Sequence, residues 1–383
     1  MEWKEVRLGD VCEIITGFPF PGKKYSKEGI RVVRGDNVTI GNLRWDAEKD
    51  KRWNEPFDKT EYYSLQANDI VIGMDGSRVG KNKARIKEED LPLLLAQRVA
   101  CVRHNELAEQ DYLYYNIFSK KFVDYVNSIH TGSAIPHISQ KQIEDYKILL
   151  PNLETQRRIA SILSSLDRKI ELNNKINADL EEMAQAIFKN WFVDFEPFKD
   201  GNFVDSELGM IPEGWKVGTL EDLITIKYGK DHKKLEDGTF PVYGSGGLMR
   251  FVNSWLYNGE SVLIPRKGTL DNIMYVCEKF WTVDTMFFSV PKMDYVMKYV
   301  YNYIKRFDFS KMNEGTSVPS NTAARLNKMQ ILIPTHEVLE MYDETLCPIY
   351  NKRKMNDKES RTLSLLRDTL LPRLMSGEIE VPE

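Results

Sequence analysis

The chain has 383 residues, of which 42% are apolar and 29% are charged, and its formal net charge at pH 7 is −4. The length exceeds that of one ordinary core and predicts two domains, while the composition excludes a disordered or low-complexity protein. The negative charge counts mildly against a nucleic-acid partner, because proteins that bind nucleic acids usually carry a basic excess.

The four cysteines and five histidines predict neither a disulfide framework nor a metal site. The cysteines are scattered without a Cys-x-x-Cys pair, and the histidines lack metal-ligand spacing. No apolar stretch is long enough to cross a bilayer, and the first residues do not read as a signal peptide. We therefore expect a cytoplasmic protein with no metal, no other cofactor and no membrane partner.

Two segments, 1–150 and 207–334, each predict an α+β domain with long loops. Short β-type runs alternate with turns rich in Gly and Asn, at 30–33, 69–73, 99–103, 261–264, 274–277 and 287–290. Helices are expected at 111–129 and 295–307. Domains of this kind usually vary their loops for recognition while keeping their core.

Two other segments, 151–206 and 335–383, predict long helices. Residues 155–192 contain no Gly or Pro, and eight of ten heptad core positions are apolar, the exceptions being Asn173 and Asn177. This pattern is typical of a coiled-coil seam with polar residues that fix its register. The second helix, at about 336–376, has a weaker seam with Asn356 near its middle.

The sequence also repeats itself. The run GSAIP at 132–136 returns as GTSVP at 315–319, and Asn173 matches Asn356 at the same offset of 183 residues. The openings Trp3-Lys4 and Trp215-Lys216 lie 212 residues apart, so only the front of the unit has changed in length. Two copies predict a pseudo-twofold molecule, in which the helices pack antiparallel and Asn173 meets or nearly meets Asn356. The alternative is two helices in separate domains with exposed asparagines.

The sequence contains no recognisable catalytic motif. Residues 244–247 (GSGG) lack the lysine of a phosphate-binding loop and are interpreted as a tight turn. No two prolines are adjacent, which excludes the Asp/Asn-Pro-Pro-aromatic loop with which amino-methyltransferases hold a target base. Residues 75–77 (DGS) are interpreted as a turn and 167–169 (DRK) as coil surface. We therefore expect a protein that is not an enzyme.

Four motifs resemble those of a known family. They are PNLETQ at 151–156 followed by Ile159-Ala160, FKNWFVDF at 188–195, LGMIPEGW at 208–215 and LLPRLMSGE at 370–378. Together with the two-unit layout, they resemble type I restriction-modification specificity subunits over the whole chain. One departure is Leu339, which stands in the second helix at the place of Gln156.

The resemblance implies a non-catalytic subunit that recognises double-stranded DNA. Residues 1–150 and 207–334 would be target-recognition domains, each for one half-site. The helices of 151–206 and 335–383 would form an antiparallel coiled coil that acts as a spacer and docks two methyltransferase (modification) subunits. Restriction subunits that translocate and cut DNA would join that core. Two unlike readers on a rigid spacer also predict an asymmetric, interrupted recognition sequence, because each reads base edges only in its own stretch of groove.

The acidic surplus lies on the helical segments, whereas positive charge clusters in the variable ones, notably at 23–24, 81–85, 230–234 and 266–267. Loops that combine positive charge, small residues and hydroxyls are the candidates for DNA contact. In the first domain they contain Lys23, Lys24, Arg34, Ser77, Arg78, Lys81, Thr131, Gly132 and Ser133. In the second they contain Lys230, Lys233, Lys234, Arg266, Lys267, Thr269, Gly315, Thr316 and Ser317. Arg78 and Arg266 are the candidates for base readout, because a guanidinium fork suits the edge of guanine. For any one residue, the alternative is a charge that contacts only water.

Two rival functions remain open at this point. One is a scaffold that binds only proteins through two domains on a coiled coil, and its affinity for DNA would lack a steep salt dependence. The other is a lone enzyme with cryptic chemistry, which would need a site that the sequence does not supply.

Overall fold

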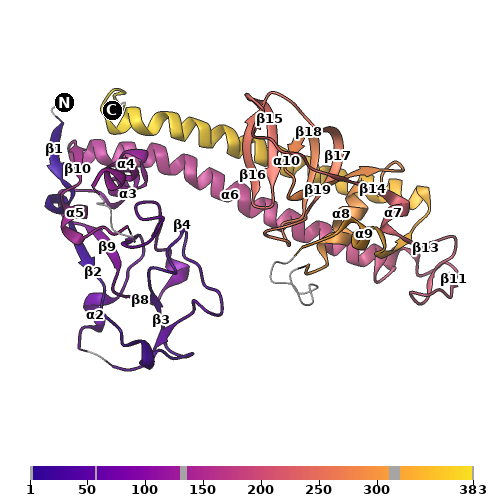
Figure 1. Ribbon diagram of the computed structural model, residues 1–383, viewed down its shortest axis with the longest axis horizontal. Helices are drawn as coiled ribbons and strands as arrows, with labels where there is room; N and C mark the ends of the chain where they lie inside the picture. The colour runs from indigo at the N-terminus through magenta and orange to yellow at the C-terminus, as the bar shows by residue number, and fades with distance from the viewer. Residues whose placement is uncertain (1–2, 57, 130–135, 310–319, 382–383) are drawn as a thin grey trace. The chain divides into compact units, whose positions relative to one another are not determined.

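The computed structural model describes the chain except for residues 1–2, 57, 130–135, 310–319 and 382–383. The chain divides into two compact units, residues 1–172 with 359–383 and residues 173–358. Two helices of 40 residues, α6 (Leu153–Phe192) and α10 (His336–Met375), contribute one part to each unit (Figure 1).

The first unit contains a five-stranded sheet with the order β2-β9-β6-β7-β4 and a three-stranded sheet with the order β5-β3-β8. The strands of the larger sheet are β2 (Cys12–Thr16), β4 (Ile40–Gly41), β6 (Ile70–Gly73), β7 (Lys83–Arg85) and β9 (Val99–His104). Those of the smaller sheet are β3 (Ile30–Val33), β5 (Arg52–Trp53) and β8 (Leu93–Leu95). The other elements are β1 (Lys4–Arg7), α1 (Leu8–Val11), short 3-10 helices at Gly22–Lys24 and Glu88–Asp90, α2 (Thr60–Tyr63), α3 (Gln110–Phe118), α4 (Lys120–Ile129), α5 (Gln140–Glu144) and β10 (Lys147–Leu150).

The larger sheet is apolar on both faces, which explains the unbroken apolar runs in its strands. Side chains alternate along a strand, so Ile70 and Ile72 of β6 pack on the same face, in one cluster with Phe122 of α4. Val71, between them, packs on the opposite face with Val33 of the smaller sheet. The larger sheet is therefore the middle of three layers.

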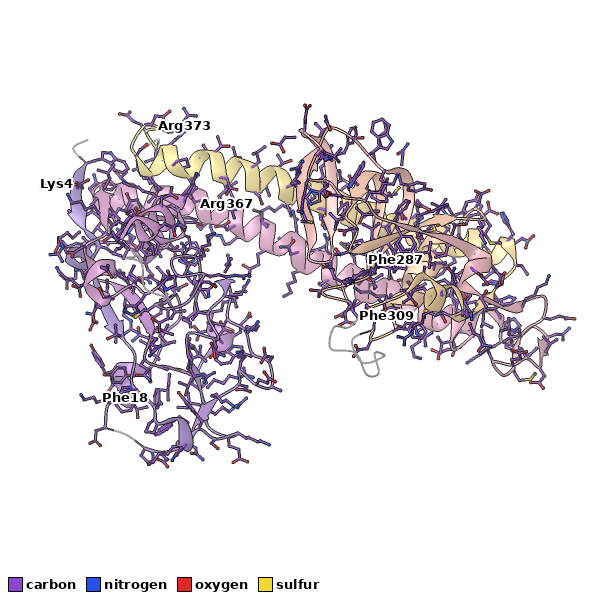
Figure 2. All side chains as sticks on the ribbon, viewed as in Figure 1. Lys4, Phe18, Phe287, Phe309, Arg367 and Arg373 are labelled. Atoms are coloured by element: carbon purple, nitrogen blue, oxygen red, sulfur yellow. The ribbon has the colours of Figure 1, made fainter. Side chains whose placement is uncertain are left out.

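The second unit contains a six-stranded sheet with the order β14-β19-β17-β18-β15-β16. Its strands are β14 (Ile224–Tyr228), β15 (Asp237–Gly244), β16 (Gly247–Val252), β17 (Tyr257–Pro265), β18 (Met274–Thr282) and β19 (Met286–Pro291). The other elements are a 3-10 helix at Glu196–Phe198, β11 (Phe203–Val204), β12 (Ile211–Pro212), β13 (Lys216–Thr219), α7 (Leu220–Leu223), α8 (Met297–Lys305), α9 (Ala323–Asn327) and β20 (Gln330–Ile333). Val262 of β17 and Phe287 of β19, labelled in Figure 2, pack with Tyr299 of α8, whereas Leu263 packs on the other face.

The internal repeat is confirmed by strand pairing. In the first unit β1 pairs antiparallel with β10, with Lys4 opposite Leu150, and in the second unit β13 pairs with β20, with Lys216 opposite Ile333. The opening and closing strands of each copy therefore meet. A tyrosine supports each closing strand, because Tyr112 donates its hydroxyl hydrogen to the carbonyl of Leu149 at 2.6 Å and Tyr299 does the same to Leu332 at 2.7 Å.

The two long helices pack antiparallel within each unit, as the repeat predicts. In the first unit Asp167 of α6 pairs with Arg367 of α10 at 2.7 Å, and Figure 2 labels Arg367. In the second unit Asn177 Nδ2 donates to Asp357 at 2.7 Å, and Glu181, one turn further along α6, pairs with Arg353, one turn earlier along α10. Partners thus advance on one helix and recede on the other.

The predicted seam asparagines lie between these pairs. Asn173 and Asn356 are buried, and Asn356 Nδ2 donates to Asn177 Oδ1 at 2.9 Å. A buried amide requires a polar partner opposite it, so such a contact disfavours other alignments of the helices. That these three asparagines fix the register stays a prediction.

The departure at Leu339 has a structural reason. In the first unit Gln156 is buried and links α6 to the preceding domain through main-chain groups, accepting from the Glu109 N–H at 2.9 Å and donating to the carbonyls of Leu107 and Pro151. In the second unit Leu339 is buried in the apolar core. Hydrogen bonds therefore hold one junction and apolar contacts hold the other.

The expected helix at 111–129 is two helices, because the chain turns at Ser119. The Ser119 hydroxyl donates to the Asn116 carbonyl at 2.7 Å and accepts from the Phe122 N–H at 3.3 Å, so it closes α3 and opens α4. Serine often competes with the helix backbone in this way. Within the described residues, no helix is both long and apolar enough to span a bilayer.

Candidate nucleic-acid interface

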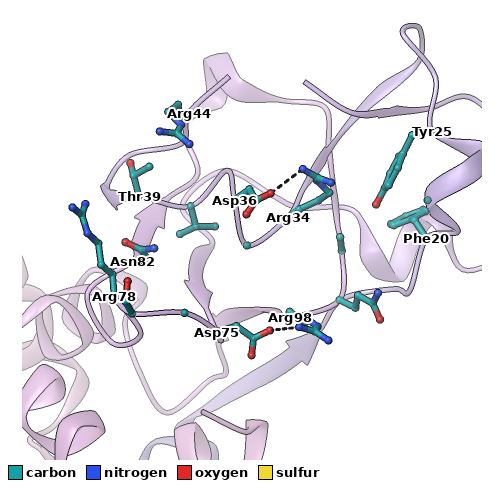
Figure 3. A pocket seen from close by; sticks show the side chains of 17 residues that line it. Phe20, Tyr25, Arg34, Asp36, Thr39, Arg44, Asp75, Arg78, Asn82 and Arg98 are labelled. Carbon is teal, nitrogen blue, oxygen red and sulfur yellow. Dashed lines mark hydrogen bonds and ion pairs between the residues drawn. The ribbon is translucent and has the colours of Figure 1, made fainter. Parts of the chain in front are cut away.

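A cleft of about 660 Å³ lies in the first unit (Figure 3). Residues from four segments line it, namely 20–25, 34–44, 75–82 and 96–98. Four of the lining residues are arginines, Arg34, Arg44, Arg78 and Arg98, and two are aspartates, Asp36 and Asp75. Guanidinium groups donate in a planar fork that matches phosphates and base edges. The cleft therefore has the chemistry of a nucleic-acid contact.

Three of the residues predicted for the first domain meet in this cleft. Arg34, Ser77 and Arg78 line it, and Lys81 is exposed in the same loop as Arg78. Lys23 and Lys24 are exposed beside the lining residue Gly22, and Lys24 pairs with Glu55 at 2.8 Å. Thr131, Gly132 and Ser133 lie outside the described residues.

Arg34 is more restrained than its sequence context suggested. Its NH2 group lies 3.3 Å from Asp36 Oδ2, its guanidinium lies 5.7 Å from the ring centroid of Tyr25, and only 26% of its side chain is exposed. The half-buried Arg34 therefore forms part of the lining of the cleft.

The positive cluster at 81–85 is smaller than it reads in sequence. Lys83 is buried, and Arg85 pairs with Asp111 and stacks on Tyr114, with 4.4 Å between the guanidinium carbon and the ring centroid. Lys81 is the member of this cluster that stays exposed.

Lys83 anchors the loop that carries Ser77 and Arg78. Its Nζ donates to the carbonyl of Gly80 at 3.0 Å and to that of Ile117, in α3, at 2.7 Å. The rings of Phe118 and Phe122 lie 5.4 and 5.0 Å from the same nitrogen. Burial among these groups lowers the pKa of Lys83 to about 7.

This pKa predicts a pH-dependent stability. Between about pH 7 and the ordinary pKa of 10.5, the unfolded chain holds a proton on Lys83 that the folded chain does not, so stability rises with pH by at most about 1.4 kcal/mol per unit. In a Lys83→Met variant this contribution is absent. Urea unfolding at pH 7 and pH 9 should therefore show a larger gap in unfolding free energy between wild type and variant at pH 9. Lys81→Met, at an exposed neighbour, should follow the wild type, and an equal gap at both pH values contradicts the burial of a neutral amine.

In the second unit, predicted residues gather at one edge of the six-stranded sheet. The N–H of Lys230 donates to the carbonyl of Thr282 at 2.9 Å, while those of Arg266 and Lys267 donate to Thr285 at 2.8 and 3.2 Å. The segments after β14 and β17 therefore both attach to the turn between β18 and β19. The Arg266 guanidinium lies 5.6 Å from the ring centroid of Tyr228.

The other predicted residues of the second unit stand apart or undescribed. Lys233 and Lys234 are exposed further along the segment after β14, and Thr269 is exposed after Lys267. Gly315, Thr316 and Ser317 lie outside the described residues. The roles predicted for all these residues in both units stay predictions.

The two sites occupy equivalent places in the repeat. In the first unit the N–H of Met74 donates to Arg98 and that of Ile138 donates to Met74; in the second, the N–H of Arg266 donates to Thr285 and that of Asn321 donates to Arg266. An isolated antiparallel bridge joins Asp75 to His137, and the equivalent bridge joins Lys267 to Ser320. We call this set of main-chain bonds the shared frame.

The shared frame also identifies a residue that sequence reasoning missed. Arg98 stands in the first unit where Thr285 stands in the second, it lines the cleft, and its NH1 lies 2.9 Å from Asp75 Oδ2. A polar pair, Gln97-Arg98, between two apolar runs was the available signal. Its partner lies 23 residues away in the sequence, so no local pattern reveals the contact.

Comparisons with known proteins agree with this two-unit architecture. A model of the type I restriction modification DNA specificity domain matches residues 1–182 and again residues 212–344. The chain is 28% identical over 310 residues to the MjaIX specificity subunit of a type I restriction enzyme from Methanocaldococcus jannaschii, covering 71% of this chain and 70% of that protein. It is 26% identical to the MjaVIII specificity subunit of the same organism, covering 99% and 93%.

A solved structure agrees on the fold. The crystal structure of a type I restriction-modification S subunit from M. genitalium matches with a TM-score of 0.58 and 17% identity, covering 98% of this chain and 96% of that one. The family model, in two copies, matches most of the present chain. The chain therefore belongs to the specificity subunits of type I restriction-modification systems, which recognise DNA and are not themselves enzymes.

Proposed function

We propose that this specificity subunit directs a type I complex to an asymmetric, interrupted DNA sequence, with residues 1–150 reading one half-site and residues 207–334 reading the other. The shared frame is the observation that carries this proposal. It recurs in both units, yet presents Asp75, Arg98 and His137 in the first and Lys267, Thr285 and Ser320 in the second. Similar supports with unlike side chains suit two half-sites of different sequence.

The helical segments, 151–206 and 335–383, serve in this proposal as the spacer and as the docking surface for two methyltransferase subunits, to which restriction subunits attach. Exposed apolar side chains on these helices support a docking role, because isolated soluble helices seldom leave such groups in water. They are Leu172, Met183, Met341, Met355 and Leu365. Asn173, Asn177 and Asn356 hold the register, and the complex acts on DNA in the cytoplasm.

DNA contact falls to the exposed cations and hydroxyls around the two sites. Phosphates are bound by Lys23, Lys24, Lys81, Lys230, Lys233 and Lys234, while base edges are read from the cleft of the first unit and the Arg266–Thr269 loop of the second. Phosphate contacts orient a protein on DNA without sequence preference, whereas contacts in the grooves select the sequence.

Salt dependence of binding tests the contact directly. The complex of the full chain with its methyltransferase partner should bind DNA with an affinity that falls log-linearly with salt, by a slope of about 0.9 per phosphate contact. A Lys230→Gln variant should lower that slope by about one. Lys147→Gln should leave it unchanged, because Lys147 already pairs with Glu5 at 2.9 Å. Fluorescence anisotropy titrations measure all three, and a slope near zero for the wild type favours a scaffold that binds only proteins.

Methylation mapping tests the two-part recognition. When the chain is expressed with its methyltransferase partner, genome-wide mapping of methylated adenines should return one sequence with two defined parts and an unspecified gap. A continuous sequence, or methylation by the purified chain alone, contradicts the proposal.

A further inference from the structure

Arg98 has an unusual backbone conformation. It lies between β8 and β9 with a φ of 68°, in the left-handed region that side chains other than glycine rarely adopt. Its carbonyl accepts the N–H of Met74 at 2.9 Å, so the shared frame holds it in place. Backbone strain that the surrounding structure maintains is common at functional sites.

The guanidinium of Arg98 is held and yet accessible. Its NH1 lies 2.9 Å from Asp75 Oδ2, and the other oxygen of Asp75 accepts from Nδ1 of His137. The Asp75 side chain is only 22% exposed, whereas that of Arg98 is 72% exposed. Figure 3 shows the Asp75–Arg98 pair in the cleft. Asp75 engages one side of the guanidinium, so its remaining donors stay available to a ligand.

The other three arginines of the cleft differ from Arg98 in one of these two properties. Arg34 is held by Asp36 but is mostly buried. Arg44 pairs with Asp46 at 3.4 Å on its own loop, so its carboxylate partner is as exposed as itself. Arg78 makes no ion pair with any residue that the structure describes. Arg98 alone among these four combines an exposed guanidinium with a mostly buried carboxylate partner.

The combination matters because base readout requires orientation. An arginine that recognises guanine donates to both O6 and N7 in the major groove, and a fixed fork loses less entropy on binding than a free side chain. Adenine and thymine offer no such pair of adjacent acceptors. A carboxylate that fixes one side of the fork leaves the other side for the base.

We propose that Arg98 recognises a guanine in the half-site of the first unit, with Asp75 and His137 as the residues that position its guanidinium. This inference rests on the proposed function and narrows it to one side chain and one base. It also explains a difference between the readers. At the equivalent place the second unit has Thr285, with Lys267 and Ser320 around it, so no guanidinium occupies that position there.

The test replaces Arg98 by glycine, which removes the guanidinium and accepts the backbone conformation. The variant should keep or raise the melting temperature, because a φ of 68° suits glycine. The matched control is Asn68→Gly, at another position of the same unit with positive φ, 72°, outside the cleft lining. Each chain is assembled with its methyltransferase partner and assayed on duplexes in which every base pair of both half-sites is varied singly.

Arg98→Gly should lose the preference for guanine at one base pair, by between about fivefold and about a hundredfold in methylation rate. Arg98→Lys should lose the same preference while keeping the salt dependence of binding, since it keeps the charge but not the fork. Asp75→Asn should lose part of it at that base pair alone. Asn68→Gly and all positions of the other half-site should match the wild type.

Different failures have different meanings. If Arg98→Gly and wild type show the same base preferences, or if the lost preference is not for guanine, the inference about Arg98 is wrong while the proposed function stands. If the wild-type complex itself shows no preference in either half-site, the proposed function fails and the inference fails with it.

Discussion

Replacing residues 1–150 by the corresponding segment of a relative should change one half of the recognised sequence and leave the other half intact. Each mismatched base pair costs about 1–3 kcal/mol, so a half-site that changes at three positions should reduce methylation of the original sequence by at least about 100-fold. The shared frame supports a local effect, because each copy of it is built from the main chain of one unit.

The structure shows where such an exchange should be made. Lys4 and Leu150 face each other in the β1–β10 pair, so both ends of the replaced segment lie together. Gln156 binds main-chain groups of residues 107 and 109, which any donor segment supplies. Tyr115, by contrast, donates to Asp167 of α6 at 2.7 Å, so the donor should carry a tyrosine there.

Methylation mapping of the chimera measures the outcome. The matched exchange of residues 207–334 should change the opposite half and serves as the control. If either chimera altered both halves, recognition would depend on the two domains jointly and the modular assignment would be wrong.

Replacing Lys298 by methionine should destabilise the second unit by about 3–5 kcal/mol. The side chain is 5% exposed, and its Nζ lies 2.7 Å from Asp343 and 3.2 Å from Glu260. Burial acts to lower the pKa of Lys298, but these two carboxylates raise it above its ordinary value. Removing the cation leaves buried carboxylates without their partner, which costs more than the ion pair itself contributes.

Urea unfolding at pH 7 measures this loss, and a double variant identifies its cause. Lys298→Met combined with Asp343→Leu removes both charges of the shorter pair, so most of the stability should return. Burial, as the largest effect, raises the pKa of Asp343, so the carboxyl group is already costly to ionise. If the double variant is as unstable as the single one, lost packing of the lysine stem explains the effect instead.

The helices could be predicted because their signal is local. Residues 155–192 have no Gly or Pro and a regular apolar spacing, and α6 covers them with two further residues at its start. The repeat predicted which strands close each domain, and the pairing of β1 with β10 and of β13 with β20 confirmed it. The turn at 244–247 was also correct, since Gly244 pairs with Gly247 across a hairpin.

The cleft was harder to predict, because its chemistry depends on contacts between distant residues. Lys83 reads as one more loop cation beside Lys81, yet it is buried, because β7 lies in the larger sheet and its side chain reaches the end of α3. Arg98 gains its orientation from Asp75, and Asp75 from His137. Such pairs form only when the sheet brings their strands together.

The shared frame also shows how the two copies diverged after an ancestral duplication. Between equivalent main-chain bonds, 78 residues separate Gly17 from Leu95 in the first unit, whereas 53 separate Gly229 from Thr282 in the second. The longer insert supplies β3, β4 and β5 and one wall of the cleft, while the floor is common to both copies. A lineage can therefore acquire a new preference by exchanging a wall of any length, and then refine it by single substitutions on an inherited floor.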